Sequence, residues 1–250
     1  VLRDPSVDFA ILETARGGIL KRGLGYMESN VSACLNVSAD HLGQRGINTL
    51  EQLAQIKRVV VEVAKDCVVL NADDMLCLQM ADFCEAERIC YVTMDSGHGL
   101  VREHIRSGGM AVVLEKGING EMITFYDRGA HIPLLWTHLI PATIEGKAIH
   151  NVQNAMFAAA IAYSFGISLE DIRQGLRIFS TSFYQAPGRL NIYDEHPFKV
   201  ILDYAHNPAA IKSITDLAGR LDVSGKRRIV LAMPGDRRDE DIIEAAQIVA

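Results

Sequence analysis

The sequence predicts an α/β fold with a doubly wound, mostly parallel sheet. Short apolar runs alternate with segments of helical spacing through residues 7–93, which is the pattern of strands joined by helices. Several polar motifs follow one another along the chain, and most of them stand where an apolar run ends. In an open α/β sheet that position is the carboxyl edge of a strand, where ligands bind.

The first region contains four predicted strands and one well-marked helix. Thr49 begins the helix, because apolar residues recur at helical spacing as far as Lys65 and Gln52 completes a capping box. Asn71-Ala72-Asp73-Asp74 ends the third strand and caps the next helix. The predicted strands are residues 7–12, 31–37, 67–70 and 89–93.

The pattern changes after residue 110, where a hairpin and a helix pair are predicted. Asn119-Gly120 lies between apolar runs at 111–114 and 122–126, which favours an antiparallel extension of the sheet. An Ala-rich helix follows at 151–165, and Ser168 caps a further helix with Asp171 at its third position. We expect these two helices to pack together.

Pro187-Gly188 is the predicted domain boundary, because a new α/β pattern begins after it. The sequence therefore predicts a large domain at 1–186 and an incomplete second domain at 187–250. The second domain has predicted strands at 190–193, 199–202 and 228–233 and predicted helices at 209–221 and 239–250. The first strand begins almost at residue 1 and the last helix has no stop signal, so we expect a piece of a longer protein.

Composition narrows the class of partner. The formal net charge of -6 disfavours nucleic acid as the main partner, since proteins bind a phosphate backbone through a basic surface. The five cysteines form no Cys-x-x-Cys pair, so we interpret them as buried reduced thiols and expect a cytoplasmic protein. No apolar stretch reaches the roughly 20 residues that a membrane span needs.

Two residues at predicted strand ends are candidate metal ligands. A carboxylate at Glu13 suits Mg²⁺, which prefers oxygen ligands, although a helix cap or a partner for Arg16 explains it equally well. His41 follows the second strand and can be a ligand, a base or an ordinary capped histidine. Lys57 has no local feature that separates it from a solvated lysine.

Asp203-Tyr204-Ala205-His206-Asn207-Pro208 lies between a predicted strand and a predicted helix. Asn207 is placed to cap the helix, and Pro208 suits its first turn. Free backbone amides at a helix start favour anions. A simple capped turn explains the same residues.

The ordered motifs together resemble the Mur ligase superfamily, whose members include peptidoglycan amino-acid-adding enzymes and folylpolyglutamate synthetase. The resemblance rests on residues 13–18, 36–41, 150–154, 187–189 and 203–208, with Lys57 between them. Residues 13–25 and 233–242 resemble the branch that adds arginine to the aspartate β-carboxyl of a poly-aspartate backbone. The resemblance implies a P-loop-type central domain, a truncated Rossmann-like C-terminal domain and a homo-oligomer.

The resemblance implies amide formation with ATP and Mg²⁺: ATP phosphorylates a carboxylate, and an amine attacks the acyl phosphate. It also implies a role for each matched residue. Glu13 and His41 would bind magnesium, Lys57 and His206 would be catalytic, and Lys57 is the position that many members carbamylate. The nucleotide ligands would be Asn151, Asn154, Arg189 and Asp203, and Asp236 and Arg237 would contact the amino acid.

One family feature is missing from this sequence. The phosphate loop, Gly-x-x-Gly-Lys-Ser/Thr, does not occur in the 250 residues. We therefore expect the isolated chain to be inactive. Two alternatives stay open: another Mur-type ligase of the peptidoglycan or folate kind, and a non-catalytic scaffold with the same fold.

Overall fold

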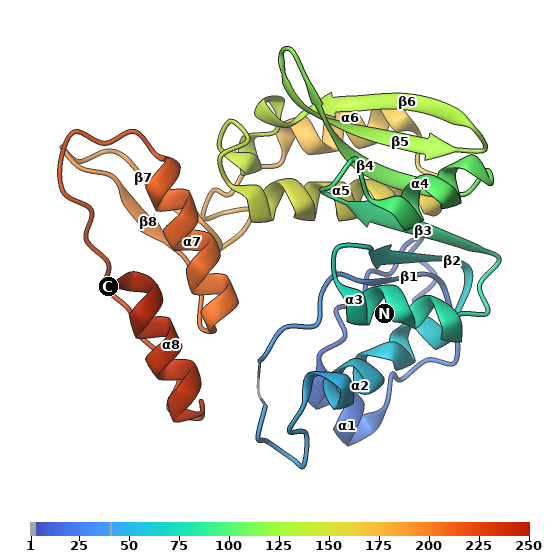
Figure 1. Ribbon diagram of the computed structural model, residues 1–250, viewed down its shortest axis with the longest axis horizontal. Helices are drawn as coiled ribbons and strands as arrows, with labels where there is room; N and C mark the ends of the chain where they lie inside the picture. Colours follow the sequence, from blue (N-terminus) through green and yellow to red (C-terminus); the bar gives the residue numbers. More distant parts are fainter. Residues whose placement is uncertain (1–3, 41) are drawn as a thin grey trace.

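The computed structural model describes residues 4–40 and 42–250, and its centre is a six-stranded sheet (Figure 1). The strands lie in the order β1-β2-β3-β4-β5-β6. The first four are parallel, and β5 and β6 extend the sheet antiparallel. The strands are β1 Ser29–Cys34, β2 Ala64–Asn71, β3 Arg88–Thr93, β4 Met110–Gly117, β5 Gly120–Asp127 and β6 Ala130–Trp136.

Helices cover both faces of this sheet, as the predicted doubly wound fold requires (Figure 1). Successive residues of β2 point to opposite faces: Val68 and Leu70 join one core cluster, and Cys67 and Val69 join the other. The crossover helices on one face are α2 Leu50–Glu62, α3 Met75–Leu78 and α4 Gly99–Arg106, and the other face carries α5 Ile149–Ser164 and α6 Leu169–Ile178. Three short 3-10 turns complete this part, η1 Gln79–Phe83, η2 Thr137–Leu139 and η3 Pro141–Thr143.

Several local predictions are confirmed by the hydrogen bonds. Thr49 and Gln52 form the capping box of α2, and the Ser168 side chain accepts from the Asp171 amide at the start of α6. Helices α5 and α6 pack together. The hairpin between β4 and β5 is also present, but its two loop residues are Ile118 and Asn119, because Gly117 pairs with Gly120.

Two predicted strands are wrong. Residues 7–12 and 228–233 adopt no strand, although their apolar pattern is strong. A strand forms only beside a pairing partner, and among the described residues neither segment pairs with one. Most of their side chains are accordingly exposed, with Ile11 at 94% and Val230 at 100%.

Besides the 3-10 turns, two helices and one strand of the described residues were not predicted, and each has a physical reason. Helix α1, Arg16–Arg22, buries none of its residues. Helix α4 begins at an unusual cap, the His98 ring, which accepts from the Val101 amide. Strand β6 contains Pro133, a residue that sheets tolerate on an edge strand.

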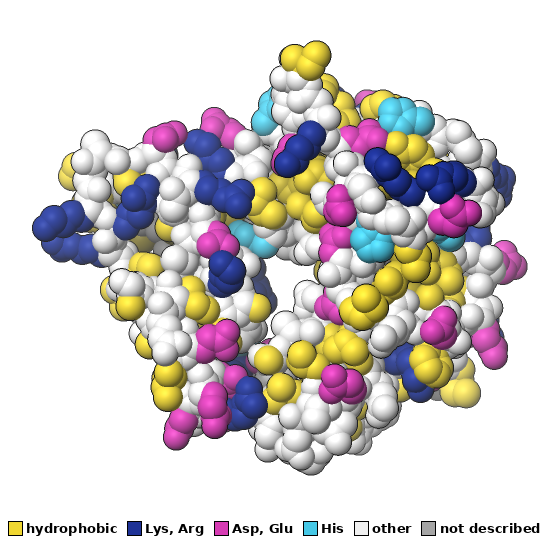
Figure 2. All heavy atoms as spheres, viewed as in Figure 1, with side chains coloured by type: hydrophobic (Ala, Val, Ile, Leu, Met, Phe, Trp, Pro, Cys, Tyr) yellow, Lys and Arg dark blue, Asp and Glu magenta, His cyan; other side chains and the backbone are white. Residues whose placement is uncertain are grey.

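The C-terminal part is a two-stranded ribbon beside two helices. The ribbon is β7 Asn191–Tyr193 with β8 Val200–Leu202, and the helices are α7 Pro208–Arg220 and α8 Asp239–Val249. The Asn207 side chain caps α7 as predicted, by accepting from the Ala210 amide. Leu190 and Leu217 form a small core with Ala148 at the start of α5. Figure 2 shows an opening between this part and the large sheet domain.

Candidate functional site

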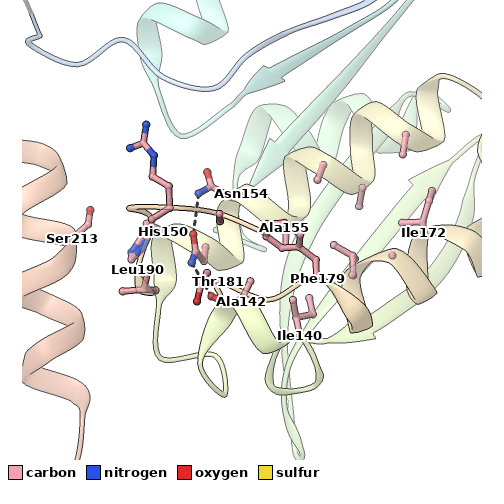
Figure 3. A pocket seen from close by; sticks show the side chains of 18 of the residues that line it. Ile140, Ala142, His150, Asn154, Ala155, Ile172, Phe179, Thr181, Leu190 and Ser213 are labelled. Atoms are coloured by element: carbon pink, nitrogen blue, oxygen red, sulfur yellow. Dashed lines mark hydrogen bonds between the residues drawn. The ribbon is translucent and has the colours of Figure 1, made fainter. Parts of the chain in front are cut away.

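A cavity of about 780 Å³ lies where α5, α6 and the segment leading to β7 meet (Figure 3). His150, Asn151 and Asn154 reach it from the first turns of α5, and Arg189 and Asp203 reach it from the C-terminal part. The structure thus brings all four predicted nucleotide ligands to one cavity. Its volume falls in the range of about 300–1,000 Å³ that small-molecule sites occupy.

The two asparagines are oriented by hydrogen bonds. The Asn151 side-chain amide donates to the Ala142 carbonyl over 2.7 Å. Asn154 then donates its own amide to the Asn151 side-chain oxygen over 3.1 Å, from one turn further along the helix (Figure 3). Since both side chains are held in place, they can present a fixed pattern of amide groups to a ligand.

Asp203 is oriented by the backbone around it. One carboxylate oxygen accepts from the Leu190 amide and the other from the Ala205 amide, each over 2.8 Å. Arg189 is exposed, and its guanidinium carbon lies 5.7 Å from the centre of the Tyr204 ring. Desolvation lowers the pKa of His150, and the nearby Asp203 carboxylate opposes this shift. A neutral imidazole and a carboxylate therefore border the cavity.

The far wall of the cavity is apolar. Small alanines of α5 face larger side chains of α6 and the segment after it, including Ile172, Leu176 and Phe179. An apolar wall beside fixed amides suits a flat heteroaromatic base, and a carboxylate at the rim suits a sugar hydroxyl. These described residues can therefore hold a small ligand that has a flat base and a hydroxyl-bearing part.

A second polar group joins the large domain to the C-terminal part. Asp40, in the loop after β1, lies 3.8 Å from His206 Nε2 and 3.3 Å from Arg237 Nη2. Arg237 also pairs with Asp236 over 2.8 Å, and the Gln44 side chain donates to the Asp236 backbone carbonyl over 2.9 Å. Two predicted site residues, His206 and Arg237, thus meet at the Asp40 carboxylate, and the third, Asp236, joins them through Arg237.

Within the described part of the chain, Lys57 makes no ion pair with this group, but it donates a hydrogen bond to the loop that carries Asp40. Its ammonium donates to the Asn36 carbonyl over 2.8 Å, at the beginning of the segment that carries Asp40. Glu13 is exposed in the segment before α1, and His41 lies outside the described residues. Across 4–40 and 42–250, no three His, Cys, Asp or Glu side chains gather closely enough to hold a metal ion.

Three residues of these sites were missed by the sequence analysis. Asp40 stands beside His41, so the motif indicated its position but not its ion pairs. His150 likewise belongs to a quoted motif without having been assigned a role. Gln44 gave no local signal, because its partner at Asp236 is distant in the sequence.

The family comparison agrees with this architecture. The Mur ligase middle domain family matches residues 1–162, and the Mur ligase glutamate ligase domain family matches residues 188–250. The chain therefore belongs to the Mur ligase family.

In the described residues, no helix has both the length and the apolar character that crossing a membrane requires.

Similar proteins narrow the resemblance further. Cyanophycin synthetase of Synechocystis sp. is 41% identical over 252 residues, which cover 100% of this chain and 28% of that protein. Cyanophycin synthetase of Nostoc sp. is 43% identical over 256 residues, which cover 100% of this chain and 27% of that protein. The chain thus spans little more than a quarter of the length of these relatives.

A solved structure has the same fold. A crystal structure of a bifunctional folylpolyglutamate synthase/dihydrofolate synthase, with Mn, AMPPNP and L-glutamate bound, superimposes with a TM-score of 0.59. The sequence identity is 22%, and the match covers 89% of this chain and 45% of that one. At this identity the likeness concerns the fold alone.

Proposed function

We propose that this chain is the part of a cyanophycin-synthetase-like enzyme that adds arginine to the aspartate β-carboxyl of a poly-aspartate backbone, using ATP. The observation that carries the proposal is the 41–43% identity to cyanophycin synthetases along the whole chain. The cavity at α5 supports it, because its apolar wall and fixed amides suit the base of a nucleotide.

The proposed reaction has two steps. The carboxylate of an aspartate side chain takes the γ-phosphoryl group of ATP, which gives an acyl phosphate and ADP. The α-amine of arginine then attacks the acyl carbon, and the amide forms as inorganic phosphate leaves. The protein contributes mainly positioning and electrostatic stabilisation in reactions of this type.

We assign nucleotide binding to residues at the cavity. Asn151 and Asn154 would contact the adenine, and Asp203 would accept a hydrogen bond from a ribose hydroxyl. The exposed guanidinium of Arg189 would reach the phosphates from the segment between the two parts. Each role is the one that the family resemblance implies, and the place of each side chain at the cavity supports it.

We assign amino-acid selection and catalysis to the group around Asp40. Asp236 offers a carboxylate to an incoming guanidinium, and Arg237 offers a guanidinium to a carboxylate. His206 and Lys57 are the proposed catalytic residues: His206 lies beside Asp40, and Lys57 donates to the Asn36 carbonyl in the loop that carries Asp40. These residues come from both parts of the molecule, and Asp40 already contacts His206 and Arg237 across the boundary.

We propose Glu13 and His41 as magnesium ligands. When bound, the ion would offset negative charge on the phosphates. Replacing Glu13 by Ala should abolish ligation with little change in far-ultraviolet circular dichroism, whereas Glu28→Ala, an exposed carboxylate nearby, should leave ligation intact. Full activity of Glu13→Ala would remove this residue from the site.

We also propose the division into domains at 1–186 and 187–250. Its support is that the glutamate ligase domain family matches from residue 188. The left-handed backbone of Gly188, at φ 74°, turns the chain at this point. Limited proteolysis of the full-length protein should cut near Pro187 before it cuts within β1–β6.

The decisive experiment uses the full-length protein that carries this chain. It is incubated with ATP, Mg²⁺ and a short poly-aspartate primer, and arginine, lysine and diaminopimelate are offered separately. An ATP-dependent mass gain of one arginine is expected. Ligation of another amine would make the protein a different Mur-type ligase, and no product with any amine would favour the scaffold alternative.

The 250 residues alone should be inactive. They lack the Gly-x-x-Gly-Lys-Ser/Thr loop whose amides and lysine hold the β- and γ-phosphates. We expect ATP hydrolysis by the isolated chain to equal a buffer blank. Hydrolysis well above the blank would contradict this expectation.

A further inference from the structure

Two of the five cysteines meet in the core beside the loop after β1. The Cys77 thiol, in α3, donates a hydrogen bond to the Cys34 sulfur, at the end of β1, and the two sulfurs are 3.5 Å apart. Cys34 is 6% exposed and Cys77 is fully buried. The sulfurs of the other three cysteines, Cys67, Cys84 and Cys90, make hydrogen bonds with backbone groups.

The surroundings of the pair favour a thiolate at Cys34. The hydrogen bond from Cys77 lowers the pKa of the Cys34 thiol, and the positive charge of Lys57 lowers it further, against the effect of burial. The same hydrogen bond and burial raise the pKa of Cys77. The two thiols are therefore unequal, and Cys34 is the more acidic of the pair and the better candidate for the attacking sulfur.

The backbone around the pair is already held together. Asp74, which caps α3, accepts a hydrogen bond from the Val37 amide over 2.7 Å, and the Asn71 side chain donates to the Leu35 carbonyl over 2.7 Å. These bonds join the start of α3 to the segment that follows Cys34. To form a disulfide, the two sulfurs would have to move from 3.5 Å to about 2.05 Å apart.

We propose that Cys34 and Cys77 form a reversible disulfide when the protein meets a peroxide. The Cys34 thiolate attacks one peroxide oxygen, the O–O bond breaks, and a sulfenic acid and hydroxide result. The Cys77 sulfur then attacks the Cys34 sulfur, the S–O bond breaks, and the proton of Cys77 leaves with the hydroxyl as water. The two thiols lose two electrons, and the peroxide gains them.

The disulfide would lie next to the loop that contacts the C-terminal part. Cys34 directly precedes the segment that holds Asn36, the partner of Lys57, and Asp40, the partner of Arg237. Oxidation therefore links the end of β1 covalently to α3 just before the loop that contacts the C-terminal part. Because both sulfurs are buried, the proposal requires a local opening around the four-residue helix α3 for a small oxidant to reach them.

The test is mass spectrometry on the full-length protein that carries this chain. The native protein is treated with hydrogen peroxide, remaining thiols are alkylated after unfolding, and the digest is searched for cross-linked peptides. We expect one peptide pair joined through Cys34 and Cys77, lighter by two hydrogens than the reduced peptides. Treatment with dithiothreitol should restore both thiols to alkylation.

A control variant separates this site from general oxidation. Cys84→Ala removes a more exposed thiol and should leave the Cys34–Cys77 cross-link unchanged, whereas Cys34→Ala should eliminate it. If Cys34→Ala fails to fold, the cross-linked peptides found in the oxidised wild-type protein still test the proposal. The proposal would be wrong if both Cys34 and Cys77 were alkylated in protein in which Cys84 is already oxidised. It would also be wrong if the cross-link joined any other pair of cysteines.

Discussion

Arg237 Nη2 lies 3.3 Å from Asp40 Oδ1, and this ion pair connects the loop before α8 to the loop after β1. The Arg237 side chain is only 4% exposed, so its charge is largely removed from water. Asp236 and Asp40 both compensate that charge. At this point the contact between the two parts of the molecule is therefore electrostatic, and it is formed by residues proposed for the site.

A double-mutant cycle on Asp40→Asn and Arg237→Gln should reveal this coupling. Loss of one partner leaves the other charge poorly compensated, so we expect a coupling energy of about 1–3 kcal/mol in the free energy of unfolding. The exposed helical pair Lys212 and Asp216 is the matched control, where about 0.3–0.5 kcal/mol is expected. Urea unfolding measures both, and equal couplings would show that the inter-domain pair has no special role.

Asn151→Ala should weaken ATP binding by the full-length protein. The substitution removes the proposed adenine contact and also the hydrogen bonds to Ala142 and Asn154. One lost hydrogen bond of about 0.5–1.5 kcal/mol corresponds to a roughly two- to tenfold rise in Kd. Isothermal titration measures it. Gln153→Ala, on the same helix but away from the cavity, should bind ATP normally, and the same Kd for both variants would contradict the assignment.

Glu115 should make stability depend on pH at the acid end. Burial acts to raise its pKa, but hydrogen bonds from Tyr126, His131 and Thr124 outweigh burial and lower the pKa below its ordinary value of 4.5. The stabilisation is therefore complete above that value and is lost as the pH falls through the lowered one. Desolvation and the Glu115 carboxylate together raise the pKa of Tyr126 to about 12.

Glu115→Gln tests this dependence. The variant should be less stable than the wild-type protein at pH 7, and the difference in free energy of unfolding should shrink as the pH is lowered. Glu121→Gln, on the same hairpin but outside the cluster, provides the control. A difference that stays constant from pH 7 downward would mean that the Glu115 charge contributes nothing to stability.

Two glycines should respond in opposite directions to alanine. Gly146 has φ 82°, and an added Cβ would lie 2.9 Å from Thr137 Oγ1, so Gly146→Ala should destabilise the fold by about 1–3 kcal/mol. Gly219 lies within α7 with open space around it, so Gly219→Ala should stabilise the helix by about 0.5–1 kcal/mol. Thermal unfolding measures both changes in stability. A rise in Tm for Gly146→Ala would contradict the predicted backbone strain.

The sequence allowed most of the sheet domain to be predicted, because its signals are local. The capping residues Thr49 and Ser168 marked helix starts, and apolar runs marked β1–β4. The prediction failed at 7–12 and 228–233 for a non-local reason. An apolar run indicates that a segment can be a strand, but only a neighbouring strand supplies its hydrogen bonds.

The candidate sites divide in the same way. Asn151, Asn154 and Asp203 were predicted by motif, and the structure brings them to one cavity. The partnership of Gln44 with Asp236 had no signal in the sequence, because it depends on how the two parts approach each other. The roles of all these residues stay predictions until the variants are measured.

The arrangement of α5 has a consequence for synthesis at the ribosome. The strands β1–β4 and their crossover helices all precede it in the chain, yet α5 contacts each of these strands and covers the face that the crossovers leave bare. That face carries apolar side chains such as Val92 and Val112. A nascent chain therefore holds an uncovered apolar surface until residues 149–164 emerge, and during that interval it is most exposed to aggregation and most in need of a chaperone.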